Sequence, residues 1–174
     1  MVSGTVQRER GFTMVELLVT LVVLAVLLAL AAPNMSTFVN SSRLRSSHGE
    51  LVSALTLARS EATKRGLPVT VKARGSTVGA EFSEGWDVFL DANANDVLDI
   101  GEKVIRAYPA LTGNQRFGTV GGEVMAIFTN RGFLKAAAPL RFKLCGQTGE
   151  PLGYRILLEP VGMADVVEDK TLCA

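Results

Sequence analysis

The apolar residues near the start of the chain form one unbroken run. Nineteen residues, Met14–Ala32, are apolar apart from Glu16 and Thr20. As a helix this run is roughly 28 Å long at about 1.5 Å per residue, close to the thickness of the hydrocarbon core of a bilayer. Arg8 and Arg10 precede it, and basic residues favour the cytoplasmic side. The pattern therefore predicts that the run spans a membrane and that the rest of the chain is exported.

The next thirty residues have a different apolar pattern, with the spacing of one helix face. The positions that recur at intervals of four and three are Leu44, His48, Leu51, Leu55, Ala58 and Ala62. Gly66 follows Lys64 and Arg65, which is typical of a helix C-terminus. We therefore expect one long helix from Met14 to Arg65, kinked at Pro33, whose second part lays its apolar face on a globular domain.

After Gly66 the apolar residues alternate with polar ones, as in strands. We expect strands at Pro68–Arg74, Gly85–Leu90, Lys103–Tyr108, Val124–Thr129, Leu140–Leu144 and Tyr154–Glu159, with a weaker one at Val161–Val167. Gly, Asn and Pro residues separate them, as antiparallel hairpins require. One helix followed by six or seven short strands predicts an α+β protein: a long N-terminal helix packed on an antiparallel sheet or a small β-sandwich.

Composition argues against enzymes and against a general attraction to nucleic acid. The formal net charge is +1, and residues 1–11 carry that +1 through Arg8, Glu9 and Arg10, which leaves 0 for the rest. The sequence has no second histidine, no Gly-x-Ser-x-Gly motif and no zinc spacing, so we expect neither an enzyme nor a bound cofactor. We expect His48 and Trp86 to pack against other side chains rather than to bind a ligand.

A short motif precedes the apolar run. The residues Gly11-Phe12-Thr13-Met14-Val15-Glu16 resemble the cleavage and methylation motif of type IV pilins and type II secretion pseudopilins. The resemblance implies that a prepilin peptidase cuts after Gly11 and methylates the amine of Phe12. It also implies that Glu16 pairs with the N-terminal amine of a neighbouring subunit. The chain would then divide into a leader (1–11), a transmembrane helix (12–32), a helix continuation packed on the head (33–66) and a β-rich periplasmic head (67–174).

Two simpler interpretations compete with this one. Ala29-Leu30-Ala31 supplies the small-x-small site of an ordinary secretory signal peptide, which would release a soluble secreted binding module. That interpretation leaves Glu16 unexplained, and the apolar run is longer than a signal peptide needs. A plain membrane anchor is the other alternative, and it leaves the Gly11-Phe12 junction without a role.

Further segments resemble one group within the pilin-like family. Residues Leu51–Gly66, Gly85–Phe89 and Asp91–Asn93 are similar to the GspH/FimT group of minor pseudopilins and minor pilins. That resemblance implies a helical spine with a β-rich head, held in the inner membrane until it assembles with other pilin-like subunits into a periplasmic filament. The filament would be a type II secretion pseudopilus, which serves protein secretion, or a type IV pilus.

DNA binding for DNA uptake is an alternative role within this group. DNA-binding relatives resemble one another in a C-terminal Gly-Arg-x-Arg pattern, whereas this chain has Gly162-Met163-Ala164-Asp165. The charged residues from Pro160 onward are Asp165, Glu168 and Asp169 against Lys170 alone, a balance that repels phosphates. We therefore expect no nucleic-acid partner, although Arg141, Lys143 and Arg155 would form a small basic patch if their strands pair.

The segment Asp91–Glu102 has the oxygen pattern of a calcium loop. The residues with side-chain oxygens have the same spacing as the ligands of an EF-hand loop. They are Asp91, Asn93, Asn95, Asp99 and Glu102. Asp96 stands where that motif requires glycine, and strands rather than helices flank the loop. A polar hairpin turn is the alternative interpretation, because Asn and Asp tolerate turn geometry.

Both cysteines, Cys145 and Cys173, lie in the part of the chain that we expect to be exported. An even number of cysteines favours a disulfide in an oxidising compartment, whereas in the cytosol both would stay thiols. With export, we predict a Cys145–Cys173 disulfide that fastens the C-terminal tail to the sheet.

Overall fold

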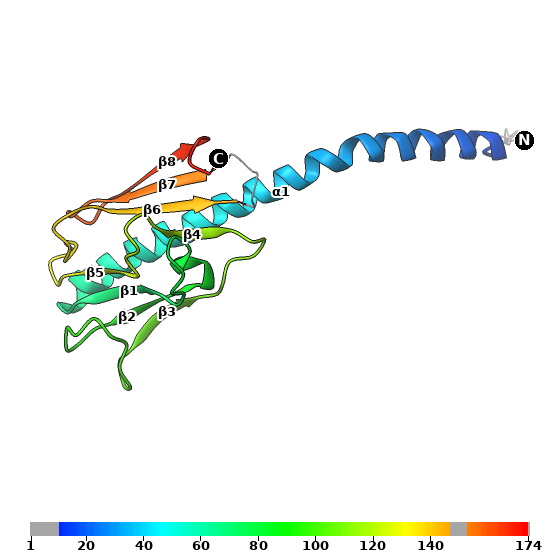
Figure 1. Ribbon diagram of the computed structural model, residues 1–174. Coiled ribbons are helices and arrows are strands. Elements are labelled where there is room, and N and C mark those ends of the chain that lie inside the picture. The colour runs from blue at the N-terminus through cyan, green and yellow to red at the C-terminus, as the bar shows by residue number, and fades with distance from the viewer. Residues whose placement is uncertain (1–10, 147–152, 174) are drawn as a thin grey trace, which may run out of the picture. The chain divides into compact units, whose positions relative to one another are not determined.

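The computed structural model describes residues 11–146 and 153–173, apart from the side chains of residues 30–34 and 36. The predicted leader therefore lies outside the described residues, except for Gly11. Figure 1 shows one long helix and eight strands. Their bounds, together with a short 3-10 helix η1, are α1 Met14–Arg65, β1 Val69–Ala73, η1 Glu81–Glu84, β2 Trp86–Leu90, β3 Val104–Tyr108, β4 Arg116–Thr119, β5 Met125–Phe128, β6 Leu140–Cys145, β7 Gly153–Leu158 and β8 Ala164–Asp169.

The helix α1 has the bounds that the sequence predicts, Met14–Arg65, and it continues through Pro33. It ends where Gly66 adopts a left-handed conformation with φ of 68° and donates its N–H to the carbonyl of Ala62 at 2.9 Å. The described chain forms two compact units that divide within α1, between Val39 and Asn40. The kink at Pro33 stays a prediction.

The first unit contains the N-terminal part of α1, whose apolar side chains up to Leu28 are exposed. Every Leu and Val from Leu17 to Leu28 is at least half exposed. Within the described residues, no helix combines the length and the hydropathy that crossing a membrane requires. The predicted transmembrane segment, 12–32, includes residues 30–32, whose side chains the structure does not describe. This segment therefore stays a prediction.

The second unit, called the head below, contains two four-stranded sheets. The strand orders are β3-β2-β1-β5 in the first sheet and β4-β6-β7-β8 in the second, and every neighbouring pair is antiparallel. This arrangement confirms the predicted α+β class. Of the two forms expected, a single sheet or a small sandwich, the head has two sheets, with α1 as a third element of its core.

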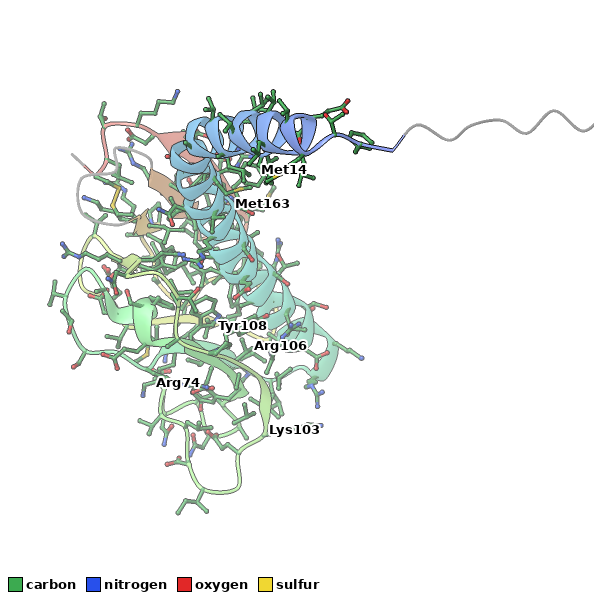
Figure 2. All side chains as sticks on the ribbon, turned by 90° about the vertical axis from the view of Figure 1, so that its right-hand side faces the viewer. Met14, Arg74, Lys103, Arg106, Tyr108 and Met163 are labelled. Carbon is green, nitrogen blue, oxygen red and sulfur yellow. A yellow bond between two sulfur atoms is a disulfide. The ribbon has the colours of Figure 1, made fainter. Side chains whose placement is uncertain are left out.

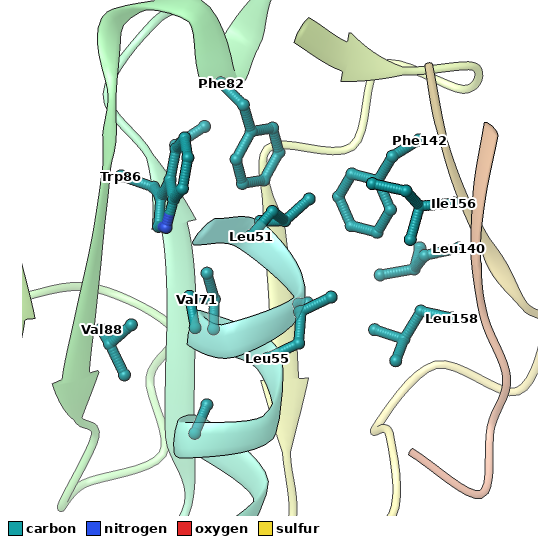
Figure 3. Close-up of a cluster of buried hydrophobic side chains, with 14 of the residues drawn as sticks. Leu51, Leu55, Val71, Phe82, Trp86, Val88, Leu140, Phe142, Ile156 and Leu158 are labelled. Carbon is teal, nitrogen blue, oxygen red and sulfur yellow. The ribbon is translucent and has the colours of Figure 1, made fainter. Parts of the chain in front are cut away.

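The core of the head forms where α1 meets both sheets. Figure 3 shows Leu51 and Leu55 of α1 between Val71, Trp86 and Val88 of the first sheet and side chains of the second. The predicted apolar stripe is confirmed, because all its members except His48 are buried. The completely buried aromatic side chains of this core are Phe82, Trp86, Phe117, Phe128 and Phe142. The expectation that Trp86 serves packing is likewise confirmed.

Seven of the eight strands lie close to their predicted positions, and β4 was not predicted. The last strand begins at Ala164 rather than Val161, because Glu159 and Met163 close a turn in which the N–H of Glu159 bonds the carbonyl of Met163 at 2.9 Å. The strand β4 has four residues, and Gly118 lies within it. A buried carboxylate supports it: Glu81 accepts the N–H of Thr119 at 3.0 Å. A Cβ at Gly118 would lie 2.2 Å from Oε2 of Glu81, so the close approach requires glycine.

Candidate processing and assembly site

The start of α1 is capped by a residue within the motif. The hydroxyl of Thr13 accepts the backbone N–H of Glu16 at 3.2 Å, which satisfies one of the donors left free at a helix start. Thr13 is therefore the N-cap, and Glu16 is the third helical residue, where a carboxylate also interacts favourably with the helix dipole. The spacing Thr-x-x-Glu is that of a capping box, a signal in the sequence from which this N-cap could have been predicted.

The predicted cleavage site precedes this cap. Gly11 and Phe12 lie outside α1, and both are exposed, with 79% of Phe12 accessible. A Cβ placed on Gly11 would meet no atom within 4 Å, so the junction is sterically open. Both residues lie outside regular secondary structure and directly precede the N-cap. Glu16 is also exposed, and its backbone rather than its carboxylate bonds Thr13.

The loop predicted to hold calcium is a polar turn closed by its own side chains. Asp91 is buried, and its two carboxylate oxygens accept the N–H groups of Asn95 at 3.1 Å and Asp96 at 2.9 Å. The amides of Asn93 and Asn95 both donate to one oxygen of Asp99, at 2.8 and 2.7 Å. These two bonds, that from Asn93 first, lower the pKa of Asp99 below its ordinary value. Glu102 accepts the N–H groups of residues 92 and 99.

The turn does contain the left-handed position that an EF-hand loop needs. Asp96 has φ of 64° although it is not glycine, and its carboxylate forms an ion pair with Lys135 at 2.8 Å. Within the described part of the chain, no group of three or more His, Cys, Asp or Glu side chains is arranged to hold a metal ion. The buried carboxylate of Asp91 already accepts two backbone N–H groups. Calcium binding by this loop stays a prediction.

The predicted disulfide is present. Cys145, the last residue of β6, is bonded to Cys173, with 5.6 Å between their Cα atoms. The bond fastens the end of the described tail to the end of β6, an inner strand of the second sheet. In the chain-entropy account, closing a loop of this length stabilises the fold by roughly 3–4 kcal/mol, because the unfolded chain loses freedom.

The basic residues of the second sheet share one face. Lys143 lies directly opposite Arg155 in the β6–β7 pair, and Arg141 is two residues along the same strand. Arg155 is paired with Asp169 at 2.6 Å, which offsets part of this charge. Gly162, where DNA-binding relatives begin their pattern, lies in the β7–β8 turn, and its carbonyl accepts a bond from Arg59 at 3.3 Å. The absence of a nucleic-acid partner stays a prediction.

Two family models match the chain over most of its length. The family described as type II transport protein GspH matches residues 49–162, and the prokaryotic N-terminal methylation motif matches residues 6–32. A curated relative, the pilin-like protein PilA1 of Thermus thermophilus, is 39% identical over 95 residues. That match covers 55% of this chain and 56% of the relative, so it spans only about half of the relative's length.

Solved structures of two proteins share the fold. The type IV minor pilin FimU of Pseudomonas aeruginosa superposes with a TM-score of 0.61 at 19% identity, over 75% of this chain and 92% of that one. The minor pseudopilin EpsH of the type 2 secretion system of Vibrio cholerae gives a TM-score of 0.54 at 12% identity, over 72% and 96%.

The methylation motif covers the capped start of α1, and the GspH match begins at Gly49, within the part of α1 that packs on the sheets, and reaches the β7–β8 turn. The chain therefore belongs to the GspH family and carries the prokaryotic N-terminal methylation motif at the start of its long helix.

Proposed function

We propose that this chain is a minor pilin or pseudopilin: a structural subunit, not an enzyme, of a type II secretion pseudopilus or a type IV pilus. The observation that carries the proposal is the methylation motif at the start of a helix whose Leu and Val side chains up to Leu28 are exposed all round. A helix that is apolar on every side is stable where its surroundings are apolar too. Lipid provides such surroundings before assembly, and the helices of neighbouring subunits provide them afterwards.

In this proposal the chain begins as a single-pass protein of the inner membrane, with its head in the periplasm. The prepilin peptidase cuts between Gly11 and Phe12 and methylates the new amine, and residues 12–32 hold the subunit until a filament takes it up. The open Gly11–Phe12 junction supports the cleavage, and the disulfide supports an oxidising compartment for the head.

Glu16 would direct the assembly. A carboxylate next to lipid is unfavourable unless it faces a partner, and the amine of Phe12 in a neighbouring subunit provides the opposite charge. The hydroxyl of Thr13 accepts the backbone N–H of Glu16. The carboxylate of Glu16 takes part in no hydrogen bond or ion pair with another described residue.

The test is made on the full chain in its host, with Glu16→Ala, Glu16→Asp and the matched control Glu50→Ala, which removes a carboxylate from the head part of α1. Mass spectrometry of the N-terminus reads the processing, and immunoblots of sheared or purified filaments read the incorporation. We expect the chain to start at methylated Phe12 in all variants. Glu16→Ala should reduce incorporation into filaments at least about tenfold, whereas Glu16→Asp and Glu50→Ala should retain it. A start at Ala32, as a secretory signal peptide would give, contradicts the proposal.

Deleting the gene identifies the machine. Secretion of exported proteins, surface piliation and uptake of DNA are measured in parallel in the deletion strain. Loss of secretion alone assigns the subunit to a pseudopilus, and loss of pili assigns it to a type IV pilus. Loss of DNA uptake with intact pili would instead support the DNA-binding alternative.

A further inference from the structure

The strand β4 is an outer strand of the second sheet, and among the described strands only β6 pairs with it. Val120, the residue after β4, donates its N–H to the carbonyl of Arg141 in β6 at 2.9 Å. Bonded and non-bonded residue pairs alternate along an antiparallel ladder. Phe117 and Thr119 therefore direct their N–H groups away from β6, toward the outer edge of the sheet.

Both of these outward N–H groups are accepted by side chains of the short helix η1. The hydroxyl of Ser83 accepts the N–H of Phe117 at 2.9 Å, and Oε2 of Glu81 accepts the N–H of Thr119 at 3.0 Å. In a wider sheet the carbonyls of a further strand would accept these two groups. The side chains of Glu81 and Ser83 thus occupy the place of that strand.

Glu81 is held at this edge by the backbone around it. Its side chain is buried, and its other carboxylate oxygen accepts the N–H of Gly79 at 2.9 Å. The lack of a side chain at Gly118 lets the carboxylate approach the backbone of β4. No ion pair of the described residues involves Glu81. Because a buried carboxylate is unfavourable without hydrogen bonds, Glu81 and the N–H of β4 satisfy each other.

Phe82, between the two acceptors in sequence, anchors η1 in the core of the head. Its side chain is completely buried, and the centre of its ring lies 5.3 Å from that of Phe142 and 6.2 Å from that of Phe117. Figure 3 shows Phe82 between Trp86 and Phe142. The core therefore sets the position of η1, and η1 sets the position of the two acceptors.

Two of the other sheet edges in the head are protected by bulges or by charge. β3 has a bulge at Ile105 in its pairing with β2, and the exposed cations Lys103 and Arg106 lie along it (Figure 2). β8 has exposed carboxylates at Asp165 and Glu168. Bulges and charged side chains both hinder the pairing of an edge with another strand.

The edge of β5 is closed for part of its length by the chain that follows it. The carbonyl of Ile127 accepts the N–H of Lys135 at 2.8 Å, and the N–H of Thr129 bonds the carbonyl of Phe133 at 2.8 Å. These bonds leave only the beginning of β5 open. The turn after β5 thus does for this edge what η1 does for β4.

The strand β4 has little protection of its own. Its register with β6 runs without a shift, and Arg116 is the single charged residue among its four. Val120 follows directly and is 65% exposed. An uncharged, regular edge is the kind that pairs most readily with strands of other molecules. Of the four edges, that of β4 depends most on a cover.

We propose that η1 is an edge cap: through Glu81 and Ser83 it holds the outward N–H groups of β4, so that no strand of another molecule pairs with them. Heads that lie close together would otherwise join through their sheets. The edge cap leaves association to other surfaces. This role concerns the head alone, so it goes beyond the proposed function and holds whether or not the chain enters a filament.

The same two bonds would be present if Glu81 and Ser83 only stabilised the fold. Their loss would then lower the stability of the head and give it no new partner. With an edge cap, their loss releases η1 from β4 and opens the edge to other molecules. A further change that removes an outward N–H of β4 closes the edge again, although it does not restore the lost bonds.

The experiment uses the full chain in detergent, as two copies with different affinity tags. The variant carries Glu81→Ala with Ser83→Ala in both copies, and the matched control carries Glu84→Ala, at an exposed carboxylate of the same helix. Association through residues 14–39 contributes equally to all samples, because no change lies there. We expect the two tagged copies of the double variant to copurify at least about tenfold more than those of the control.

A proline then tests whether the new contact uses β4. Thr119→Pro removes an N–H that points away from β6, so it costs no bond of the sheet, and proline is tolerated on edge strands. Added to the double variant, it should return copurification to the level of the control. A role in stability alone predicts no such return.

Amide hydrogen exchange, resolved to single residues, measures the edge itself. The N–H groups of Phe117 and Thr119 should exchange at least about tenfold faster in the double variant than in the original chain. Ser83→Ala alone should accelerate the exchange of Phe117 and leave that of Thr119 slow. Trp86 fluorescence in urea shows whether each variant is folded.

A folded double variant that copurifies no more than the control overturns the proposal. An increase that Thr119→Pro leaves unchanged overturns it as well, because the contact would then lie elsewhere. If the double variant is unfolded, Ser83→Ala decides the question. Faster exchange at Phe117 with more copurification than the control supports the edge cap, and faster exchange without it overturns the proposal.

Discussion

The two parts of α1 are continuous in sequence but differ in where their apolar side chains lie and in how deeply these are buried. Up to Leu28 the helix is apolar on all sides, and its Leu and Val side chains are at least half exposed. From Asn40 onward it has one apolar stripe, and Leu44, Leu51 and Leu55 on that stripe are at most 2% exposed. The second part thus buries its apolar stripe within the chain, whereas the apolar side chains of the first part up to Leu28 stay exposed in it.

The difference separates residues that stabilise the fold from residues that serve assembly. A substitution in the stripe changes the free energy of unfolding of the head, because the stripe contacts both sheets. A substitution before Leu28 removes no contact within the head. Trp86, the only tryptophan, is fully buried in the head, so its fluorescence reports the unfolding of the head alone.

The largest effect is expected from a leucine deletion in each part. Leu51→Ala should lower the free energy of unfolding by about 3–5 kcal/mol, since it leaves a cavity between α1 and the sheets. Leu24→Ala, the matched control in the exposed part, should leave that free energy unchanged. The measurement is urea denaturation of the full chain in detergent, followed by Trp86 fluorescence. A comparable loss in Leu24→Ala would mean that the first part of α1 also stabilises the head.

The disulfide is expected to come next. Cys145→Ser with Cys173→Ser should lower the stability of the head by about 3 kcal/mol, because the unfolded chain regains the freedom of the closed loop. The same denaturation, with and without reductant, measures it: the reductant should weaken the original chain and leave the double variant unaffected. Equal stability of the two oxidised proteins would show that strand pairing alone holds the tail.

A smaller effect is expected at the polar turn. Asp91→Ala should cost about 2 kcal/mol in the presence of a chelator, because the N–H groups of Asn95 and Asp96 lose their buried acceptor. Asp99→Ala, at a less buried acceptor of the same turn, should cost less. If millimolar calcium raises the melting temperature of the original chain and Asp91→Ala abolishes the rise, the predicted calcium site is present as well.

The smallest effect is a dependence on pH at the border of the buried stripe. His48 lies against the ring of Tyr154, 4.3 Å between centroids, and burial, followed by the charge of Arg45, lowers its pKa below 6.5. The unfolded chain therefore binds the proton more readily. The contribution of neutral His48 is present above pH 6.5 and is lost as the pH falls through that value toward the lowered pKa.

Chemical denaturation at about pH 7.5 and about pH 5.5, on either side of the ordinary histidine pKa, measures this contribution. His48→Phe should reduce the difference between the two. The control Tyr154→Leu keeps the histidine and removes its ring contact. An unchanged pH dependence in His48→Phe would assign it to the carboxylates instead.

The periodic parts of the fold could be predicted from the sequence, because each repeats a local rule. The bounds of α1 follow from the apolar run, the stripe and the Gly66 terminus. β4 does not follow from such a rule: its four residues include Gly118, and it depends on Glu81, a carboxylate far away in sequence. Thr13 could have been found as an N-cap from the Thr-x-x-Glu spacing.

The candidate site likewise has features that could be predicted from the sequence and features that could not. The motif Gly11–Glu16 is contiguous, so its residues could be named from the sequence alone. The oxygen atoms of the Asp91–Glu102 loop could also be counted. Which donor each oxygen accepts depends on how the loop closes, and that geometry turns Asp91 inward.

The Cys145–Cys173 bond also determines how the head carries mechanical load. Tension applied between α1 and the C-terminus passes through the sulfur atoms and bypasses β7 and β8, which lie inside the closed loop. The 28 residues of sequence separation amount to about 95 Å of extended chain that pulling cannot release. A stretched subunit would therefore lengthen only by the chain outside the loop, and the last two strands would keep their pairing while the rest of the head yields.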